Sequence, residues 1–423
     1  MMQKYRILGK KGEGTFSEVL KCQSVENGQY YACKRMKQQF DSLEQVNNLR
    51  EIQCMRRLSP HANIVELIEV IFDKKSGTLA LILELLDQNL YEVIKSRKNH
   101  LTEARCRTYI YQTLKALDHM HRNGIFHRDI KPENILFKND GVKLADFGSC
   151  RSVHSKQPFT EYISTRWYRA PECLLTDGWY TYKMDVWSIG CVFAEILSFH
   201  PLFPGSNELD QINRIHKILG TPSPDLLKKF KKSKHMDFNF PAEPGTGLYA
   251  VLSHSISNDA LKVVEWLCIY DPDNRPSAKQ ILRHNYFKPQ RDADKRSRAV
   301  VKNNLVNDYY SYSTEKPGLK ITSDKFQKTL PKSINTGTSL LSSALPSNKY
   351  HFKNKISYKT TLPKIPVSSL DGKGVNKFPT SVFPSLMQKE RDKIKAQEEA
   401  VKRLGYAEYS LPGLAKLRHD RKM

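Results

Sequence analysis

Short segments of alternating apolar and polar residues fill the chain from residue 4 to residue 37, interrupted by one glycine-rich turn. Alternation with a period of two predicts β-strands with one buried face. Two later apolar runs, IVELIEVIF and LALILEL, indicate further strands. Before those runs, residues 41–58 predict one helix. Its apolar positions at helical spacing are Leu43, Val46, Leu49, Ile52 and Met55. The chain therefore begins with a strand-rich region that carries a single helix.

From residue 87 onward the pattern becomes mainly helical. The segment LDQNLYEVI begins a helix, and residues 101–123 form a long one that ends at Asn123 and Gly124, a C-terminal capping signal. Residues 178–200 predict a very apolar helix that opens at Asp185, a residue type that caps helix N-termini. This second region is expected to bury most of the apolar side chains.

The apolar pattern stops near residue 290. From there to about residue 385 the chain is rich in Ser, Thr, Lys, Asn and Pro, with only isolated apolar residues. Such a segment buries too little to offset the entropy of ordering, so we expect it to be disordered. Residues 386–404 predict a helix with charges of both signs along its faces, ended by Gly405.

The basic charge of the chain is concentrated in this last region. The whole chain has a formal net charge of +24, of which residues 288–423 contribute +16 through 28 Lys and Arg against 12 Asp and Glu. These lysines could contact nucleic-acid phosphates in a salt-sensitive way. Because no aromatic platform or known binding fold accompanies them, a nucleic-acid partner is disfavoured.

The cysteine pattern excludes a disulfide-stapled or zinc-binding class. None of the eight cysteines forms a close CxxC pair, so we expect reduced, partly buried thiols in an intracellular protein. The first ten residues lack an apolar secretory core, and no apolar run approaches the roughly 18 residues that span a bilayer. No transmembrane segment is expected. The cysteines are Cys22, Cys33, Cys54, Cys106, Cys150, Cys173, Cys191 and Cys268.

The richest chemistry lies in residues 127–148, HRDIKPENILFKNDGVKLADFG. Asp129 can accept the proton of a hydroxyl group, while Asn134 and Asp146 can offer oxygen ligands to Mg²⁺, a hard ion that keeps several waters beside substrate phosphates. Apolar residues flank a turn at residues 139–141, which predicts a hairpin that holds Asn134 and Asp146 on one side. The stretch has the parts of a phosphate-transfer site.

Two upstream features fit the same chemistry. In the turn KGEGTFSEV, Gly12 and Gly14 would let backbone amides approach a triphosphate, although an ordinary glycine hairpin is the alternative. Lys34 ends the apolar strand YYACKRM, and Glu51 lies on the predicted helix as its candidate partner. Taken singly, the lysine reads as a solvated strand end and the glutamate as a surface charge.

In this combination and order, the motifs resemble those of the protein kinases. The runs TEYISTRWYRAPECLLTDG, YYACKRMKQ and NNLREIQ resemble the male-germ-cell-associated and intestinal-cell kinase family, in the group of cyclin-dependent and mitogen-activated kinases. The resemblance implies an α+β, bilobal protein kinase fold. It implies a small antiparallel lobe with one helix over residues 4–86 and a larger helical lobe over 87–287, with an insert near 200–255. The basic tail, 288–423, would follow.

The resemblance also assigns roles to individual residues. Lys11 departs from the pattern, because an aliphatic residue usually covers the adenine there, so its stem would pack while its ammonium faces water. Asn89 would lie near the ribose. The implied ATP-binding residues are Lys11, Gly12, Glu13, Gly14, Thr15, Phe16, Ser17, Glu18, Val19, Ala32, Lys34, Leu83, Glu84, Leu86 and Leu136. The implied catalytic residues are Lys34, Glu51, Asp129, Lys131 and Asn134, and the implied metal ligands are Asn134 and Asp146.

The segment from residue 149 to residue 172 resembles an activation segment that ends in the motif APE. Thr160 and Tyr162 would be its two phosphorylation sites, in the sequence TEY. Arginine side chains hold phosphate groups in bidentate fashion. The resemblance gathers Arg50, Arg128 and Arg151 around phosphorylated Thr160, and gives Arg166 and Arg169 to phosphorylated Tyr162.

Three further residues have structural roles in the resemblance. Thr165 would hydrogen-bond near Asp129 and Lys131. Asp185 would brace the backbone of the catalytic loop, and Glu172 would form a buried ion pair with Arg275.

The expected function is therefore an ATP- and Mg²⁺-dependent serine/threonine kinase, proline-directed and activated by phosphorylation of the TEY motif. Its partners would be protein substrates with Ser/Thr-Pro sites and an upstream kinase, unless the chain phosphorylates itself. The resemblance adds cilium and nucleus to an expected cytoplasmic location. A pseudokinase scaffold that binds partners through its fold and tail is the alternative; the sequence does not indicate the oligomeric state.

Overall fold

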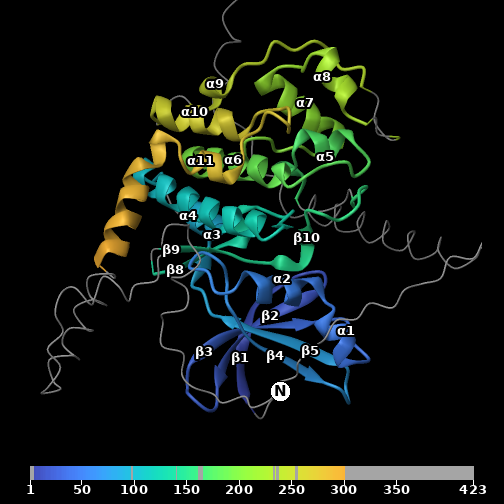
Figure 1. Ribbon diagram of the computed structural model, residues 1–423, viewed down its shortest axis with the longest axis vertical. Helices are drawn as coiled ribbons and strands as arrows, with labels where there is room; N and C mark the ends of the chain where they lie inside the picture. Colours follow the sequence, from blue (N-terminus) through green and yellow to red (C-terminus); the bar gives the residue numbers. More distant parts are fainter. Residues whose placement is uncertain are drawn as a thin grey trace, which may run out of the picture. The chain divides into compact units, whose positions relative to one another are not determined.

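The five-stranded sheet at the start of the chain is antiparallel, with strand order β1-β2-β3-β5-β4 (Figure 1). The computed structural model describes residues 4–300 except 97–98, 140, 161–164, 232–233, 235–237 and 253–255. All described residues belong to one unit of the chain. The strands of the sheet are β1 (Tyr5–Glu13), β2 (Ser17–Ser24), β3 (Tyr30–Met36), β4 (Leu67–Asp73) and β5 (Thr78–Glu84). The expected strand-rich first region is present.

Strand β5 has two buried faces, and each face packs against a different cluster. Leu79 and Leu81 pack with Val46 and Ile52 on the side of the helices, while Ala80 and Ile82 pack with residues of β1, β2 and β3 on the other side. Alternate side chains of a strand point to opposite faces, so this central strand is apolar throughout. The sheet is thereby fixed to the helix that carries Glu51.

The predicted helix over residues 41–58 is two helices, α1 (Leu43–Asn47) and α2 (Arg50–Leu58). Ser42 caps α1, accepting a hydrogen bond from the Gln45 amide at 3.2 Å. The helical conformation ends at Asn48, because Leu49 has extended backbone angles (φ −64°, ψ 124°). Asparagine is a weak helix former, so the pair Asn47–Asn48 allows this break. The interruption places Arg50 and Glu51 in the first turn of α2.

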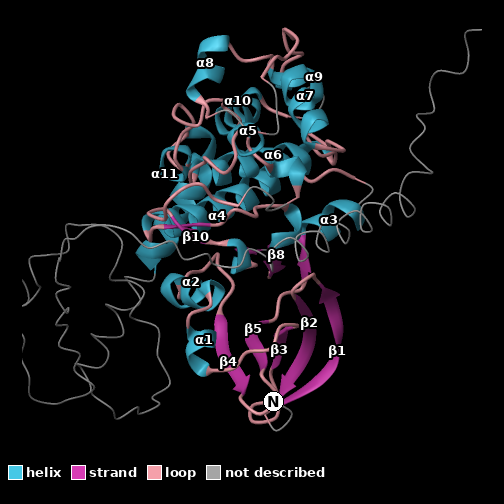
Figure 2. Cartoon of the chain, turned by 90° about the vertical axis from the view of Figure 1, so that its right-hand side faces the viewer, coloured by secondary structure: helices cyan, strands magenta, loops and turns pink. Residues whose placement is uncertain are grey.

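The second region is mainly helical, as expected (Figure 2). Helix α6 is its centre, because every residue from Met184 to Leu197 is buried. The helices are α3 (Leu90–Ser96), α4 (Glu103–Arg122), α5 (Pro171–Leu175), α6 (Lys183–Ser198), α7 (Glu208–Leu219), α8 (Pro224–Lys229), α9 (Leu248–Leu252), α10 (Asn258–Leu267) and α11 (Ala278–Ile281). Short 3₁₀ helices are η1 (Pro132–Asn134), η2 (Phe147–Ser149), η3 (Arg166–Tyr168) and η4 (Asn285–Phe287).

Two small sheets connect the loops around residue 130. Strands β8 (Ile135–Lys138) and β9 (Gly141–Leu144) form the predicted hairpin, and β6 (Gln88–Asn89) pairs with β8. Strand β7 (Ile125–Phe126) pairs with β10 (Arg151–Ser152). The second pairing joins the segment before residue 127 to the start of the expected activation segment, so both ends of the candidate catalytic stretch are held by backbone hydrogen bonds.

The packed part of the chain extends beyond the boundary expected at residue 287. Residues 288–300 are helical, and Asp294 accepts hydrogen bonds from Tyr111 Oη at 3.0 Å and Lys115 Nζ at 2.9 Å on α4. Arg291 donates to the carbonyl oxygens of Leu282 and His284. Composition alone missed this helix because its contacts are polar rather than apolar. The expected disordered tail beyond 300 and the helix expected at 386–404 lie outside the described residues.

Candidate active site

Lys34, Glu51 and Asp146 meet between the sheet and the helical region. Lys34 Nζ lies 2.6 Å from Glu51 Oε1 and 3.0 Å from Asp146 Oδ1. Burial of Lys34 opposes its charge, but the carboxylates of Asp146 and Glu51 outweigh this and raise its pKa. In turn the ammonium keeps the pKa of Asp146 below its ordinary value, against the effect of burial. The expected ion pair of Lys34 with Glu51 is present.

Asp129 lies in a buried network with Asn134 and Lys131. Asn134 Nδ2 donates to the Asp129 carbonyl at 2.8 Å and to its Oδ2 at 3.1 Å, and Lys131 Nζ lies 3.1 Å from the same Oδ2. The other carboxylate oxygen, Oδ1, is buried without a hydrogen-bond partner among the described residues. A buried acceptor left unpaired is costly. Asp129 Oδ1 is therefore the atom available to a hydroxyl group from outside.

Asp185 holds the backbone that precedes Asp129. Its carboxylate accepts the N–H groups of His127 and Arg128, each at 2.8 Å, and contacts His121 Nε2 at 3.0 Å. Arg128 has a positive φ of 72°, a conformation that is rare for a residue with a side chain. The expected brace is present. The expected helix cap is absent, because α6 begins at Lys183 and the Asp185 carboxylate is directed at the loop instead.

The oxygens of Asn134 and Asp146 fit a magnesium ion. Asn134 uses its amide nitrogen toward Asp129, so its Oδ1 is the atom that would face a cation. Asp146 has a left-handed backbone (φ 62°) and a side chain that is 46% exposed. Within the described ranges there is no cluster of three His, Cys, Asp or Glu side chains suited to a metal. Mg²⁺ bound beside phosphates needs only one or two protein oxygens besides water and substrate.

The glycine-rich turn connects β1 to β2 and is closed by its own backbone. The Gly14 N–H donates to the Ser17 carbonyl at 2.8 Å, and an added side chain at Gly12 would meet open space. Glu13 pairs with Lys10 at 2.5 Å and Lys37 at 2.6 Å, while Glu18 pairs with Arg35. Lys11, Thr15 and Phe16 are exposed, and Ser17 is buried. The Lys11 ammonium is on the outside, as the resemblance implied.

The residues expected around adenine come from strands β2, β3, β5 and β8 and from the loop that follows β5. In the sheet, Val19 pairs with Lys34 and Ala32 pairs with Leu83. Five of the expected residues are half-buried, which leaves apolar surface for a ligand: Val19, Ala32, Leu83, Leu86 and Leu136.

Glu84 and Asn89 have structural partners of their own. The carboxylate of Glu84 binds Lys138 at 3.0 Å and Lys143 at 2.5 Å, and its N–H donates to the Glu66 carbonyl. Asn89 Oδ1 accepts the Glu92 amide at 2.8 Å, and Glu92 Oε2 accepts the Asn89 amide at 2.9 Å. This reciprocal pair caps α3. Both side chains are thus engaged in the fold, while the implied contacts of the Glu84 backbone with adenine and of Asn89 near the ribose stay predictions.

Arg50, Arg128 and Arg151 form one cationic cluster. The pKa of Arg151 is lowered first by burial and then by the charges of Arg50 and Arg128. Arg128 is 2% exposed, with its guanidinium 5.8 Å from the ring centres of Phe159 and Tyr180. Tyr180 in turn donates to the Thr160 carbonyl at 2.7 Å. The three arginines that the resemblance gathered are indeed close together, and the aromatic residues link them to Thr160.

The two arginines expected at phosphorylated Tyr162 are separately engaged. Arg169 Nη1 pairs with Glu208 at 3.1 Å, and Arg166 Nη1 donates to the Ser206 carbonyl at 3.2 Å. Tyr162 lies outside the described residues, and the expected hydrogen bond of Thr165 near Asp129 and Lys131 stays a prediction.

The segment that carries Thr160 is anchored to the helical region at both ends. Arg275 and Glu172 form the expected buried ion pair, with two hydrogen bonds of 2.7 and 3.0 Å. The Phe159 N–H donates to the Gly178 carbonyl at 2.8 Å. Gly178 has a φ of 88°, and an added Cβ would collide with the Phe159 carbonyl, so only glycine allows this approach.

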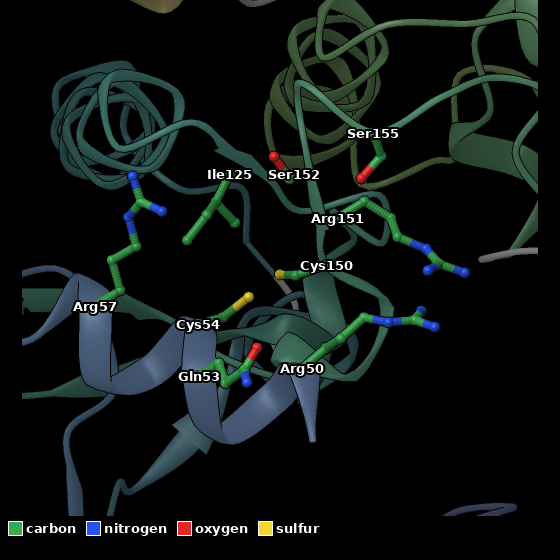
Figure 3. A pocket seen from close by; sticks show the side chains of 9 residues that line it. All are labelled: Arg50, Gln53, Cys54, Arg57, Ile125, Cys150, Arg151, Ser152 and Ser155. Carbon is green, nitrogen blue, oxygen red and sulfur yellow. The ribbon is translucent and has the colours of Figure 1, made fainter. Parts of the chain in front are cut away.

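Sequence reasoning missed part of the cationic site. A cavity of about 210 Å³ beside Arg50 and Arg151 is also lined by Gln53, Cys54 and Arg57 of α2 (Figure 3). The available signal was their spacing, because residues at i, i+3, i+4 and i+7 from Arg50 share one face of a helix. Arg57 thereby becomes a further cation that lines this cavity, on the side opposite Arg50 and Arg151 (Figure 3).

Comparison with known proteins gives a consistent result. The family model for the protein kinase domain matches residues 5–287. The human protein called MAPK/MAK/MRK overlapping kinase is 62% identical over 70% of each chain. The mouse serine/threonine-protein kinase ICK is 41% identical over 68% of this chain and 45% of its own length, and the rat serine/threonine-protein kinase MAK is 40% identical over 68% and 46%. These relatives agree with the resemblance drawn from the motifs. The chain covers less than half of the ICK and MAK chains.

Proposed function

The chain belongs to the protein kinase family, and we propose on this premise that it transfers the γ-phosphoryl group of ATP to serine and threonine hydroxyls of other proteins. The observation that carries the proposal is the buried, unpartnered Oδ1 of Asp129 beside Asn134 and Lys131. Two relatives that match over 68% of this chain are named as serine/threonine-protein kinases. A carboxylate poised in this way suits proton acceptance from a substrate hydroxyl.

In the proposed reaction Asp129 orients the substrate hydroxyl and accepts its proton at Oδ1. The hydroxyl oxygen then bonds to the γ-phosphorus, and the bond from that phosphorus to the β-phosphate oxygen breaks to release ADP. Lys131, whose ammonium lies 3.1 Å from Asp129 Oδ2, supplies positive charge beside the transferred group.

Lys34 would hold the α- and β-phosphates while Glu51 keeps its ammonium in place. Because the ammonium already lies between Glu51 and Asp146, little rearrangement is needed when a nucleotide binds. Magnesium bound through Asn134 and Asp146 supplies neutralisation of the charge that develops on the phosphate oxygens. The half-buried apolar residues around Ala32 and Leu136 would enclose adenine.

The same proposal includes activation by phosphorylation of Thr160 and Tyr162. A phosphate on Thr160 would bring about −1.5 to −2 charge to Arg50, Arg128 and Arg151, which otherwise repel one another. Phosphorylated Tyr162 would have to draw Arg169 away from Glu208 or share it. We further propose Ser/Thr-Pro sites as targets, an upstream or autocatalytic activator, and cytoplasm, cilium and nucleus as locations. The described residues contain no helix long and apolar enough to cross a membrane.

A phosphorylation assay tests the central proposal. The full chain is incubated with Mg·ATP and a peptide library that varies the residue after Ser or Thr, beside the variants Asp129→Asn and Asp225→Asn. Asp129→Asn should lower the rate by about 10²- to 10⁴-fold, whereas Asp225→Asn on the exposed face of α8 should leave it unchanged. Equal rates in the parent and Asp129→Asn would instead favour a pseudokinase scaffold. A rate indifferent to proline would remove only the proposed specificity.

A further inference from the structure

The cavity beside α2 contains two cysteines that face each other. Cys54 comes from the middle of α2, and Cys150 follows η2 at the start of the activation segment. Figure 3 shows their two sulfur atoms directed toward one another, with Arg50, Arg57 and Arg151 around the same cavity. A cavity of about 210 Å³ is large enough to admit a small oxidant to them.

The surroundings make the two thiols chemically unequal. The pKa of Cys54 is lowered, first by its interaction with the neighbouring Cys150 thiol and then, against burial, by the positive charges of Arg57 and Arg50; Glu51 opposes the effect. Burial raises the pKa of Cys150, and the neighbouring Cys54 adds to this. The thiolate is the reactive form of cysteine. Cys54 lies on the same helix as Arg50 and Arg57 and lines the cavity with them, so it takes the role of the attacking thiol and Cys150 that of the resolving thiol.

We propose that Cys54 and Cys150 are a peroxide-sensitive thiol pair that closes to a reversible disulfide between α2 and the activation segment. The Cys54 thiolate attacks one oxygen of hydrogen peroxide and the O–O bond breaks. Hydroxide leaves, and Cys54 becomes a sulfenic acid. The Cys150 sulfur then attacks the sulfenic sulfur, and its proton and the sulfenic hydroxyl depart as water. Each sulfur loses one electron overall, and one peroxide becomes one water and one hydroxide, which takes up the proton that Cys54 released on ionising to form the second water.

The disulfide would restrain the helix that carries Glu51. A disulfide holds its two Cα atoms about 4.4–6.8 Å apart, so α2 would be fixed against the residues that follow Asp146. On the proposed kinase function, this keeps Glu51 beside Lys34 whether or not Thr160 is phosphorylated. Phosphate and disulfide would thus be two routes to the same position of α2.

The chain contains a matched control pair. Cys191 of α6 and Cys268, which follows α10, are also neighbouring buried thiols. Burial and the neighbouring Cys268 raise the pKa of Cys191 well above its ordinary value, and neither thiol lines the cavity beside α2. A cysteine pair alone therefore does not distinguish the two places. The two pairs differ in their access to a cavity and in the arginines nearby, so only Cys54 and Cys150 should be oxidised in the folded protein.

The test treats the folded full-length chain with millimolar hydrogen peroxide, blocks remaining thiols with N-ethylmaleimide after unfolding, and maps peptides by mass spectrometry. We expect a cross-linked Cys54–Cys150 peptide pair that dithiothreitol separates, and slower hydrogen exchange in α2 of the oxidised protein. Cys54→Ala should abolish the link and leave Cys150 blocked as a free thiol. Cys191→Ala should retain the link, and Arg57→Gln should form it severalfold more slowly.

Several outcomes would overturn the proposal. One is that both thiols remain free under conditions that oxidise other residues; another is that Cys191 and Cys268 cross-link at least as fast. Oxidation of Cys54 to sulfinic acid without a link to Cys150 would also contradict it. None of these readouts depends on phosphotransfer, so they stand apart from the kinase assay. Because Cys54→Ala could weaken folding, its thermal unfolding is compared with that of Cys191→Ala, and Cys54→Ser provides a second variant.

Discussion

Asp185 accepts the backbone N–H of Arg128 at 2.8 Å, although 57 residues separate them in the chain. The same carboxylate accepts the N–H of His127. Two backbone donors are thereby satisfied inside the protein, and the strained backbone of Arg128, with its φ of 72°, is held in place. Asp129 follows directly, so the position of the candidate base depends on a side chain from α6.

Replacing Asp185 by Asn should therefore lower phosphotransfer. The amide retains one acceptor oxygen but presents an N–H₂ group to a second backbone donor, which leaves a buried N–H unpaired. We expect a loss of turnover of at least tenfold and destabilisation of about 1–3 kcal/mol. Steady-state kinetics and urea denaturation would measure the two effects. Unchanged kinetics would show that phosphotransfer does not depend on the hydrogen bonds that Asp185 accepts from this loop.

Removing one partner of the buried pair Glu172–Arg275 should be more damaging to stability. Both side chains are almost completely buried, and an uncompensated buried charge costs about 3–5 kcal/mol. Arg275→Met should therefore unfold at much lower urea concentration. The exposed pair Lys228–Asp225 is the control, since Lys228→Ala should cause no measurable change. Similar midpoints for the two variants would contradict the prediction.

Glu195 should make stability fall between about pH 4.5 and pH 7. Burial raises the pKa of Glu195 to about 7, although the hydrogen bond from Tyr168 Oη at 2.7 Å opposes this. The folded protein therefore binds the proton more tightly than the unfolded chain, and its advantage is lost as pH rises through this range, by about 3 kcal/mol. Glu195→Gln, which keeps an acceptor for Tyr168, should lose less stability than the parent.

Urea denaturation of both proteins at pH 5 and pH 8 would test this difference. The variant is expected to gain on the parent at pH 8. If the free energy of unfolding of the parent, relative to that of the variant, instead rises with pH, folding lowers the pKa of Glu195 and the prediction is wrong.

Thr160→Ala and Tyr162→Phe together should prevent activation. Without phosphate the mutual repulsion of Arg50, Arg128 and Arg151 persists, so we expect at least tenfold lower activity on a peptide substrate than in the activated parent. Ser155→Ala, which removes a hydroxyl nearby in the same segment, provides the control. Equal activity of the double variant and the phosphorylated parent would refute the switch.

The motifs foretold the fold and the ion pairs well, because each carries strong local constraints. Lys34 at a strand end and Glu51 on a helix are ordinary charged residues when taken singly, so their pairing was predicted by the resemblance to the protein kinases. The break at Asn48 could not, because apolar spacing continues through it. The capping of α3 by Asn89 also escaped notice, since the resemblance gave that residue to the ribose and the reciprocal Glu92 was not considered.

Features that depend on distant side chains were the least predictable. The proximity of Cys54 and Cys150 joins positions 96 residues apart, and neither belongs to a spaced motif. The approach of Gly178 to Phe159 is likewise visible only in three dimensions. Packing through polar contacts, as at Asp294, leaves no apolar period in the sequence.

Asp294 lies seven residues beyond the last position matched by the protein kinase family, yet it holds Tyr111 and Lys115 of α4. A fragment that ends at residue 287 would leave both side chains exposed to solvent without their acceptor. A fragment that ends at residue 300 would keep Asp294 as that acceptor. The stretch matched by the family model therefore ends before the last side chain that packs against α4.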